Sequence, residues 1–410
     1  MVFGSNRKST PNRYPCIVIL QRTYDSEARD KNVVEAFTWQ PGPPVETFAE
    51  VFRQNHFLLP QKSLKPDLWR IENPSKLLFL DRIRASGKPL REIVGSRVYR
   101  GITTGYNEAF VVDGATRKAL VAADKSSAHL IKPYLRGKDV KRWRAWSESH
   151  WLIFTRRGID ITKYPAVYEH LKAFKKRLMP GVVDGRKPGS YEWFEIQDNI
   201  AYWEEFERPK IVSTKVSIRP TFALDTAGSY LGNTAYFFPV TSGGQFLLGL
   251  LNSNLFLAYA RRVFVEKQGG WYEVQPDGLE SFPIPSATPK QQVAIERIVS
   301  YLLWLSSQSN LADQKLSNPR DPLMSAYWEQ VLNGLVYELY FQEDLYVHSL
   351  RLFDLVTAAA LPDLDVLPER ERLPRLRAEF ERTYATEHPL RGALSTLRSL
   401  EIVRTIEGDP

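Results

Sequence analysis

The chain has 410 residues, of which 43% are hydrophobic and 25% charged, a composition that excludes a disordered or fibrous protein. At about 150 residues per domain, there is room for two or three domains with cores of their own. The single cysteine, Cys16, excludes a disulfide framework, and no histidines are spaced as metal ligands, so we expect no metal. The apolar runs are far shorter than the roughly 20 residues of a membrane span, and residues 1–10 lack a secretory signal. We therefore expect a soluble, cytoplasmic protein with no membrane partner.

Charge is unevenly distributed along the chain. The formal net charge is +8, but residues 131–190 alone carry 15 Lys and Arg against 5 Asp and Glu, a balance of +10. Residues 321–410 carry 9 Arg, no Lys and 16 acidic residues, a balance of −7. A concentrated basic segment favours a polyanionic partner such as nucleic acid, and the alternative is a basic face that only meets solvent.

The first 95 residues predict two strands followed by a helical connector. Residues 14–20 and 33–39 have the apolar, β-branched pattern of strands, and the polar residues 23–32 between them predict a turn. Two strands are not stable alone, so this first segment, residues 1–45, requires a sheet supplied from elsewhere. Helices are predicted at 45–55 and 75–86 within the connector, residues 46–95.

Residues 96–290 predict one mixed domain, and residues 291–410 predict a helical region. Apolar residues recur at helical spacing from position 295 onward. The fold class is therefore α+β, with short strands in the central domain and an all-α C-terminal region. The predicted strands of the central domain cover 97–104, 109–112, 151–155, 210–218, 221–225 and 236–240, and its helices cover 164–179 and 245–264.

Sequence signatures of a self-contained active site are missing. The chain has neither a Gly-x-x-x-x-Gly-Lys-Ser/Thr loop nor a Gly-x-Gly-x-x-Gly turn. Asp67, Glu72 and Lys76 come nearest to the carboxylate and lysine set of a magnesium-dependent nuclease, but their spacing does not match. Cys16 lies in an apolar run, where an inert buried thiol is expected. We therefore expect no catalytic residue and no cofactor in this chain.

Five segments, read in order, resemble a known family. Together they are similar to the TaqI-like specificity (target recognition) domain of N6-adenine DNA methyltransferases and of the Type IIG restriction–modification enzymes built on them. The resemblance covers residues 90–290. The segments are GITTGYNEAFVV at 101–112, IKPYLRGKDVKRW at 131–143, ERPKIV at 207–212, LGLLNSN at 248–254 and LESFPIP at 279–285.

The flanking segments extend the resemblance, but the catalytic motifs of the family are missing from this chain. Residues 14–20 are similar to one of the last strands of the family's methyltransferase sheet, and residues 335–341 to the helix that follows the specificity domain. The catalytic Asn/Asp-Pro-Pro-Tyr/Phe motif and the cofactor-binding glycine loop are missing. The resemblance implies double-stranded DNA as partner, and a complete enzyme that methylates a flipped adenine with S-adenosyl-L-methionine. This chain alone would be inactive and would depend on a methyltransferase catalytic chain or domain.

The basic segment supplies the first group of candidate DNA contacts. Its cations are expected to contact phosphates, which sets the register of the protein on the duplex. The aromatic residues Tyr134, Trp143 and Trp146 lie between them; they either anchor the loop in the core or stack on a splayed base. The candidates of this segment are Lys132, Tyr134, Arg136, Lys138, Lys141 and Arg142, and the cations Arg144, Arg156 and Arg157 continue the series.

Three further segments supply candidates for reading bases. A turn with Gly101 and Gly105 would let the backbone approach a groove closely, while its polar side chains contact bases or only cap the turn. Lys or Arg would pair with guanine, and Gln with adenine. The candidates are Arg100, Thr103, Thr104, Tyr106 and Asn107 at this turn, Lys210, Lys215 and Arg219 along a strand, and Lys267, Gln268, Trp271 and Tyr272 around Gly269–Gly270.

Two other functions remain open from the sequence. The chain is a stand-alone metal-dependent nuclease if an unrecognised carboxylate cluster binds magnesium. It is a protein-interaction scaffold if the acidic helical end, residues 321–410, is the functional part and the basic segment only meets solvent.

Overall fold

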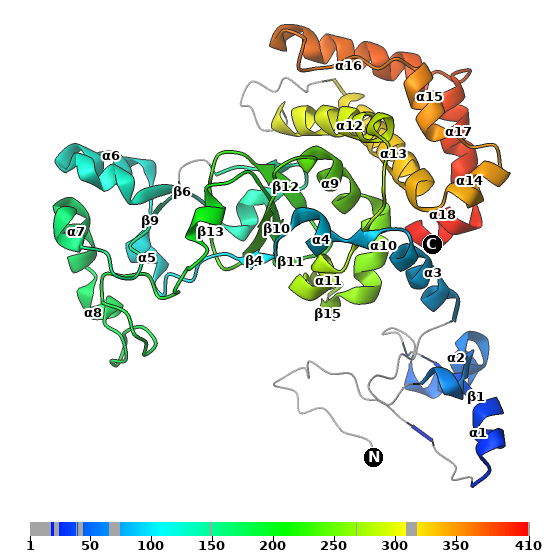
Figure 1. Cartoon of the computed structure of the whole chain (residues 1–410), viewed down its shortest axis with the longest axis horizontal. Helices are drawn as coiled ribbons and strands as arrows, with labels where there is room; N and C mark the ends of the chain where they lie inside the picture. The colour runs from blue at the N-terminus through cyan, green and yellow to red at the C-terminus, as the bar shows by residue number, and fades with distance from the viewer. Residues whose placement is uncertain are drawn as a thin grey trace. The chain divides into compact units, whose positions relative to one another are not determined.

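The computed structural model describes residues 18–19, 24–37, 39, 44–64, 74–147, 150–267, 269–308 and 318–408. The chain divides into two compact units, Met1–Gly87 and Lys88–Pro410 (Figure 1). The first unit contains a two-stranded antiparallel sheet, and the second contains the three- and four-stranded sheets and the longest helices.

The first unit is a small hairpin-like sheet with helices beside it. Its elements are α1 (Ser26–Lys31), β1 (Val33–Ala36), η1 (Val45–Thr47), α2 (Phe48–Asn55), β2 (Phe57–Pro60), η2 (Gln61–Ser63) and α3 (Pro74–Ala85). The second predicted strand is confirmed as β1, but the predicted turn at 23–32 contains α1, where Asp25 accepts a hydrogen bond from the backbone N–H of Glu27 at 2.9 Å. The first predicted strand lies outside the described residues except for Val18 and Ile19, which are exposed and belong to no strand.

Two four-stranded sheets form the centre of the second unit. The first has the order β12-β10-β14-β4 and is antiparallel, and the second has the order β13-β6-β9-β5 with β13 parallel to β6. Phe110, Phe206 and Phe237 belong to one apolar core that joins both sheets. The strands are β4 (Tyr99–Arg100), β5 (Val111–Val112), β6 (Ile131–Leu135), β9 (Trp151–Ile153), β10 (Lys210–Thr214), β12 (Phe222–Asp225), β13 (Tyr230–Leu231) and β14 (Ala235–Pro239).

Short helices surround the second sheet at one end of this unit (Figure 1). Asp113 caps α6 by accepting a hydrogen bond from the backbone N–H of Thr116 at 2.7 Å. We call residues 107–198 the basic lobe. Its helical elements are α5 (Asn107–Phe110), α6 (Gly114–Ala123), η3 (Lys125–His129), η4 (Gly137–Asp139), η5 (Ile161–Lys163), α7 (Pro165–Lys172) and α8 (Lys175–Leu178), and the short strands β7 (Val140–Lys141) and β8 (Arg144–Ala145) form a hairpin within it.

Residues 203–284 complete this part of the unit: a helix packs against β10 and β12 of the first sheet, and a second hairpin forms a separate three-stranded sheet with a short strand that follows β10. The helix predicted at 245–264 is two helices, because the hydroxyl of Ser253 accepts a hydrogen bond from the N–H of Phe256 and begins a new helix there. The elements are η6 (Trp203–Phe206), β11 (Val216–Ser217), α9 (Gly244–Leu251), α10 (Asn254–Val263), β15 (Val265–Lys267), β16 (Trp271–Glu273), α11 (Pro276–Glu280) and β17 (Pro283–Ile284), which pairs with β3 (Lys88–Pro89) before α4 (Leu90–Val94).

The C-terminal region is helical, as the sequence predicts. Trp328, Leu332 and Val336 of α13 are fully buried at its centre. Gly249 of α9 allows close packing on α12, since a Cβ there would meet the Val299 side chain at 2.9 Å. The helices are α12 (Pro289–Gln308), α13 (Asp321–Tyr340), α14 (Gln342–Val347), α15 (Leu352–Ala358), α16 (Glu369–Tyr384), α17 (Pro389–Leu397) and α18 (Glu401–Glu407). Among the described residues, no helix has the length and apolar character required to span a membrane.

Candidate nucleic-acid interface

Several cations of the predicted phosphate-binding segment have partners inside the protein. Lys132 forms an ion pair with Glu207 at 2.8 Å, and Arg136 pairs with Asp139 at 2.9 Å. Arg142 pairs with Glu329 of α13 and also donates to the carbonyl of Asn252 at 2.6 Å. These contacts stabilise the conformation of the basic segment. Of the six candidates in this segment, Lys138 and Lys141 are the ones that lie exposed to solvent.

The corner at η4 shows how the protein uses one of these arginines. Arg136 donates through its backbone N–H and its guanidinium to Asp139, at 2.8 and 2.9 Å. Burial alone would raise the pKa of Asp139, but the hydrogen bonds from Arg136 outweigh it and lower that pKa. The carboxylate is thus kept charged, and Arg136 is largely committed to shaping the turn.

The aromatic residues of the basic segment divide between core and surface. Tyr134 and Trp143 are 4% and 6% exposed, and burial raises the pKa of Tyr134 to about 12. Trp143 has a left-handed φ of 71° and its indole Nε1 donates to Glu329 at 3.0 Å. Both residues are core anchors, so the prediction that Tyr134 contacts DNA is wrong. Trp146 is 46% exposed, with the Arg144 guanidinium 4.5 Å from its ring centre.

Lys210 is buried completely. It lies on β10 directly opposite Asp225 of β12, and its Nζ is 2.6 Å from Asp225 Oδ2. It also donates to the carbonyl of Phe206. Burial lowers the pKa of Lys210, whereas the charge of Asp225 favours the protonated form. The prediction that Lys210 contacts DNA is wrong, because its ammonium group joins two strands of the sheet inside the protein.

The glycine turn at 101–107 approaches the protein itself. A Cβ at Gly101 would lie 2.1 Å from the carbonyl oxygen of Gly232, and a Cβ at Gly105, which has φ +86°, would lie 2.6 Å from the Arg186 side chain. The prediction that these two glycines let the backbone approach a DNA groove is therefore wrong. They let the backbone pack closely against other parts of the protein. Thr104 is 2% exposed and its hydroxyl bonds to Asn107 Oδ1 at 2.7 Å, so the prediction that Thr104 contacts DNA is also wrong.

Asp198 holds the other polar groups of this turn in place. Its carboxylate accepts hydrogen bonds from the backbone N–H of Thr103 at 2.8 Å and from Arg100 at 3.1 Å. Tyr106 is half-buried, with the Arg177 guanidinium 5.3 Å from its ring centre, and Asn107 is exposed. The turn therefore presents Arg100, Tyr106 and Asn107 from a fixed backbone.

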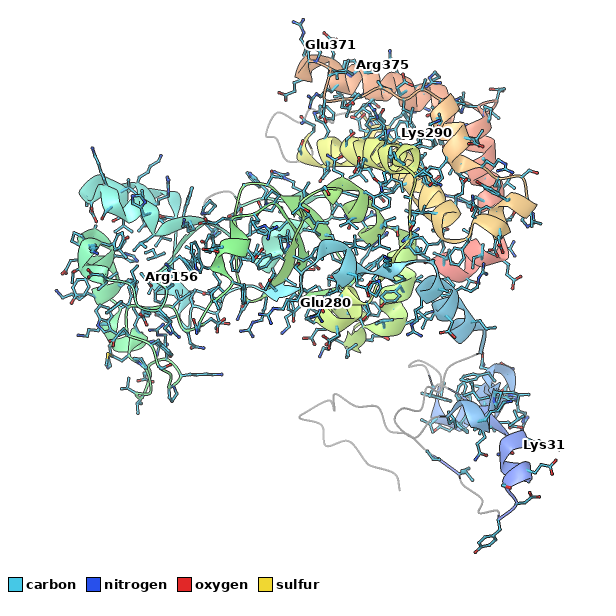
Figure 2. All side chains as sticks on the ribbon, in the orientation of Figure 1. Lys31, Arg156, Glu280, Lys290, Glu371 and Arg375 are labelled. Carbon is cyan, nitrogen blue, oxygen red and sulfur yellow. The ribbon has the colours of Figure 1, made fainter. Side chains whose placement is uncertain are left out.

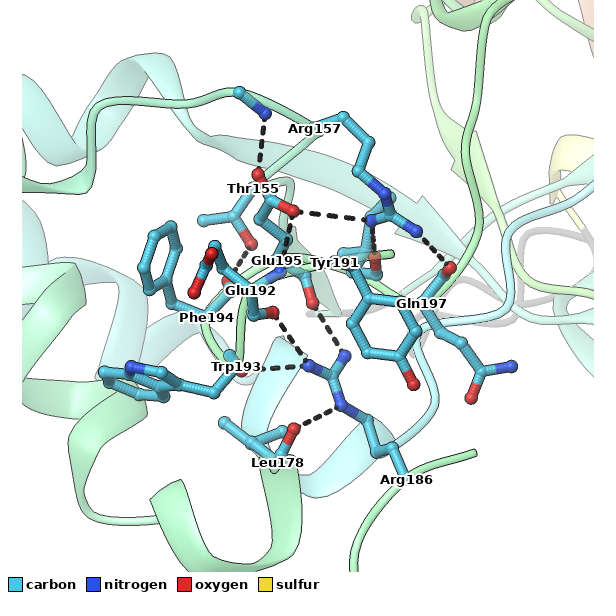
Figure 3. A network of polar contacts seen from close by, with 12 residues as sticks. Thr155, Arg157, Leu178, Arg186, Tyr191, Glu192, Trp193, Phe194, Glu195 and Gln197 are labelled. Carbon is cyan, nitrogen blue, oxygen red and sulfur yellow. Dashed lines mark hydrogen bonds and ion pairs between the residues drawn. The ribbon is translucent and has the colours of Figure 1, made fainter. Parts of the chain in front are cut away.

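Arg186 organises this turn, and the sequence did not single it out. It is 4% exposed and donates to the carbonyl oxygens of Leu178 at 2.8 Å and Glu195 at 2.6 Å (Figure 3). It also donates to the carbonyl oxygen of Thr104 at 3.1 Å. Two further carbonyls, of residues 192 and 193, accept from its Nη2 atom at 3.3 and 2.9 Å. Burial lowers the pKa of Arg186 to about 10, so the group stays charged at neutral pH.

Exposed arginines lie over aromatic rings near the same turn. Arg97 lies 5.3 Å from the ring centre of Tyr99 and 5.9 Å from that of Tyr202, whose hydroxyl donates to the carbonyl of Arg100 at 2.8 Å. Arg156, labelled on the basic lobe in Figure 2, lies 4.6 Å from the ring centre of Trp203. We call Arg97, Arg100, Arg156, Tyr99, Tyr202 and Trp203 the arginine–aromatic patch. Cations over aromatic faces keep their outer N–H groups available to an anion.

The predicted second loop is a β-hairpin. Strands β15 and β16 pair antiparallel around Gly269 and Gly270, both with positive φ, while Gln268 lies outside the described residues. Lys267 and Lys215 both form ion pairs with Glu273, at 2.7 and 3.4 Å. Trp271 is 43% exposed and Tyr272 is half-buried beside it.

Arg219 belongs to the interior more than to the surface. It donates to Asn254 Oδ1 at 2.7 Å, and burial lowers its pKa to about 10. The side chain thus supports the start of α10. In the described part of the chain, no three His, Cys, Asp or Glu side chains form a group suited to a metal ion.

The central part of the chain resembles a specificity domain. Residues 132–284 match the family model described as the TaqI-like C-terminal specificity domain, which confirms the predicted resemblance over that range. Among solved structures, the chain is similar to the Type IIL restriction-modification enzyme MmeI in complex with DNA, with 16% sequence identity and a TM-score of 0.44. That match covers 70% of this chain but only 35% of the length of the other. No curated protein matches the chain.

Proposed function

We propose that residues 88–408 recognise double-stranded DNA in a sequence-specific manner, as the specificity part of a restriction–modification system. The match of residues 132–284 to the TaqI-like specificity domain is the observation that carries this proposal. The surface supports it, because exposed cations remain after internal pairing: Lys138, Lys141, Arg97 and Arg156. Cations at such positions neutralise phosphates and release counterions.

The arginine–aromatic patch gives the proposed contact its geometry. A guanidinium over an aromatic face loses less side-chain freedom on binding than a free one, and it presents two N–H groups to one phosphate. Asp198 fixes Arg100 next to the turn at 103–107. The patch would set the register on the duplex, while Asn107 and Trp271 are the exposed side chains suited to reach base edges.

Replacing Arg97 and Arg156 by alanine tests this surface. Each replacement should weaken binding to any duplex and reduce the slope of log K against log salt by about one, because one phosphate contact is lost. Fluorescence anisotropy with a labelled duplex across a salt series measures both quantities. Arg398→Ala, at an exposed position of the C-terminal region, is the control that should change neither. An unchanged salt slope in the double variant R97A/R156A would contradict the assignment of the patch.

We further propose that the complete system is an adenine-N6 methyltransferase that uses S-adenosyl-L-methionine, with this chain as its specificity part. The cofactor would supply the methyl group that is transferred to adenine. Among the described residues, Gly244 in the glycine turn before α9 does not favour a cofactor-binding loop. The turn from β14 into α9 carries Gly243 and Gly244, but a Cβ at Gly244 would lie 3.1 Å from Val240, so this glycine serves the packing of the chain itself. We assign cofactor binding to a separate catalytic domain or chain.

Methyl transfer by the purified chain alone is therefore expected to be undetectable. Incubation with duplex DNA and S-adenosylmethionine labelled in its methyl group measures the transfer, because any product carries the label into DNA. Binding of the same duplex in the same buffer is the positive control. Label in the DNA without a second protein would show that this chain holds a complete active site.

A further inference from the structure

A small closed loop follows α8 at the outer end of the basic lobe, where the chain after α8 forms the lowest part of that lobe in Figure 1. The backbone N–H of Gly181 donates a hydrogen bond to the carbonyl of Arg186 at 2.9 Å. The backbone N–H of Arg186 donates to the carbonyl of Met179 at 3.0 Å. At the tip of the loop, the N–H of Gly185 donates a hydrogen bond to the carbonyl of Val182 at 3.0 Å. Asp184 has a left-handed φ of 61°. The loop is thus fastened at its base and has a defined tip.

Apolar side chains occupy this tip. Val182 is 46% exposed and Val183 is 87% exposed. Val183 gains little from packing within the described structure, Val182 keeps nearly half of its surface exposed, and contact of apolar side chains with water is unfavourable. The neighbouring exposed charges are mostly positive: two acids, Asp184 and Glu192, and the cations Lys175, Lys176, Arg177 and Lys187.

The loop and the glycine turn share one rigid support. Arg186, at the base of the loop, also binds the carbonyl of Thr104, and its Cδ leaves no room for a side chain at Gly105. Arg177, on the helix that leads into the loop, lies over Tyr106. The valine tip is therefore held in a fixed relation to the turn that presents Tyr106 and Asn107.

We propose that Val182 and Val183 form a wedge that enters a groove of duplex DNA and partly unstacks a base step, while the flanking cations contact phosphates on both sides. This inference rests on the proposed function and adds a contact site to it. Apolar side chains that insert at base steps, on a cationic surface, are an established means of kinking a duplex. Asp184 favours DNA over a lipid bilayer, because a carboxylate next to Val183 is costly in hydrocarbon but accepts a hydrogen bond from a base amino group.

The double variant Val182→Ser, Val183→Ser in the full chain tests the wedge. The matched control is Val347→Ser, Val366→Ser, which removes two valines that are 82% and 77% exposed in the C-terminal region. The probe is a duplex selected by the wild-type chain from a pool with a randomised centre. The tip variant should bind this duplex about tenfold more weakly, with an unchanged salt slope because no cation is removed. Permanganate should oxidise unstacked thymines of the duplex with wild type and control, and far less with the tip variant.

The outcomes separate this inference from the proposed function. Wild-type affinity and wild-type permanganate reactivity in the tip variant would overturn the wedge and leave the proposed function standing. Failure of the wild-type chain to bind any duplex would overturn both. Binding of wild type to vesicles of phosphatidylserine and phosphatidylcholine that is lost in the tip variant, with DNA binding intact, would assign the tip to membranes instead. Equal thermal unfolding of all three proteins confirms that the comparison concerns folded chains.

Discussion

Replacing Arg186 by alanine is expected to lower the free energy of unfolding of the second unit by about 3–5 kcal/mol. The guanidinium donates to five backbone carbonyls, of Thr104, Leu178, Glu192, Trp193 and Glu195, and it is 4% exposed. Its loss removes a donor from all five carbonyls: those of Thr104 and Glu192 keep the backbone N–H groups of Gln197 and Glu195, whereas those of Leu178, Trp193 and Glu195 lose the guanidinium that binds them. Denaturation of the full chain in urea, followed by tryptophan fluorescence, measures the change.

The same substitution should also loosen the 179–186 loop. Since Arg186 joins the 179–186 loop to Thr104, limited proteolysis should cut R186A first between residues 179 and 198. Arg186→Lys should rescue little, because an ammonium group cannot reproduce the planar fork that reaches carbonyls on several sides. Arg398→Ala, at an exposed position, is the matched control. A loss below about 1 kcal/mol in R186A would show that the carbonyls find other donors.

Replacing Lys210 by methionine is expected to cost about 3–5 kcal/mol of unfolding free energy, because it leaves the carboxylate of Asp225 charged, buried and without its cation. Asp225 is 4% exposed and also accepts hydrogen bonds from the backbone N–H groups of Ala227 and Ser229, so it cannot turn toward solvent without breaking the turn that follows β12. Methionine fills the same volume, which separates the loss of charge from the loss of packing. The same urea titration measures the effect.

Arg208 provides the control for Lys210 in the same strand connection. It pairs with Glu205 at 2.8 Å, but both side chains are partly exposed. An exposed pair contributes only about 0–1 kcal/mol, so Arg208→Met should leave the midpoint nearly unchanged. Equal effects at Lys210 and Arg208 would contradict the buried ion pair.

The sequence predicted the fold class and the long helices α12 and α13 because hydrophobic periodicity is a local property. Both helices fall where their apolar repeats lie, β10 and β12 fall within predicted strands, and β14 begins one residue before its predicted strand. Two elements were predicted incorrectly, a helix and a turn. The predicted helix 245–264 is interrupted by the cap at Ser253, and the predicted turn 23–32 contains α1.

The candidate site was predicted less well, because burial of charge depends on partners far away in the sequence. Lys210 and Asp225 meet only through the register of β10 and β12, which no local pattern specifies. Arg142 finds its carboxylate at Glu329, 187 residues further along. Arg186 went unnoticed since loops rich in glycine and proline usually expose their cations. A basic segment thus predicts a region of positive charge, whereas which of its cations remain exposed follows from tertiary structure.

The contacts between the segment 132–284 and α13 determine which part of the chain can be exchanged between relatives. Arg142 and Trp143 both bind Glu329, and the backbone N–H of Asn254 bonds to Asn333 of the same helix at 2.8 Å. A chimaera that exchanges only residues 132–284 would cut through these contacts and leave charged and amide groups facing a foreign helix. Transplants between relatives should therefore carry the helices through α18 along with the strands, so that the reading surface travels with the scaffold that shapes it.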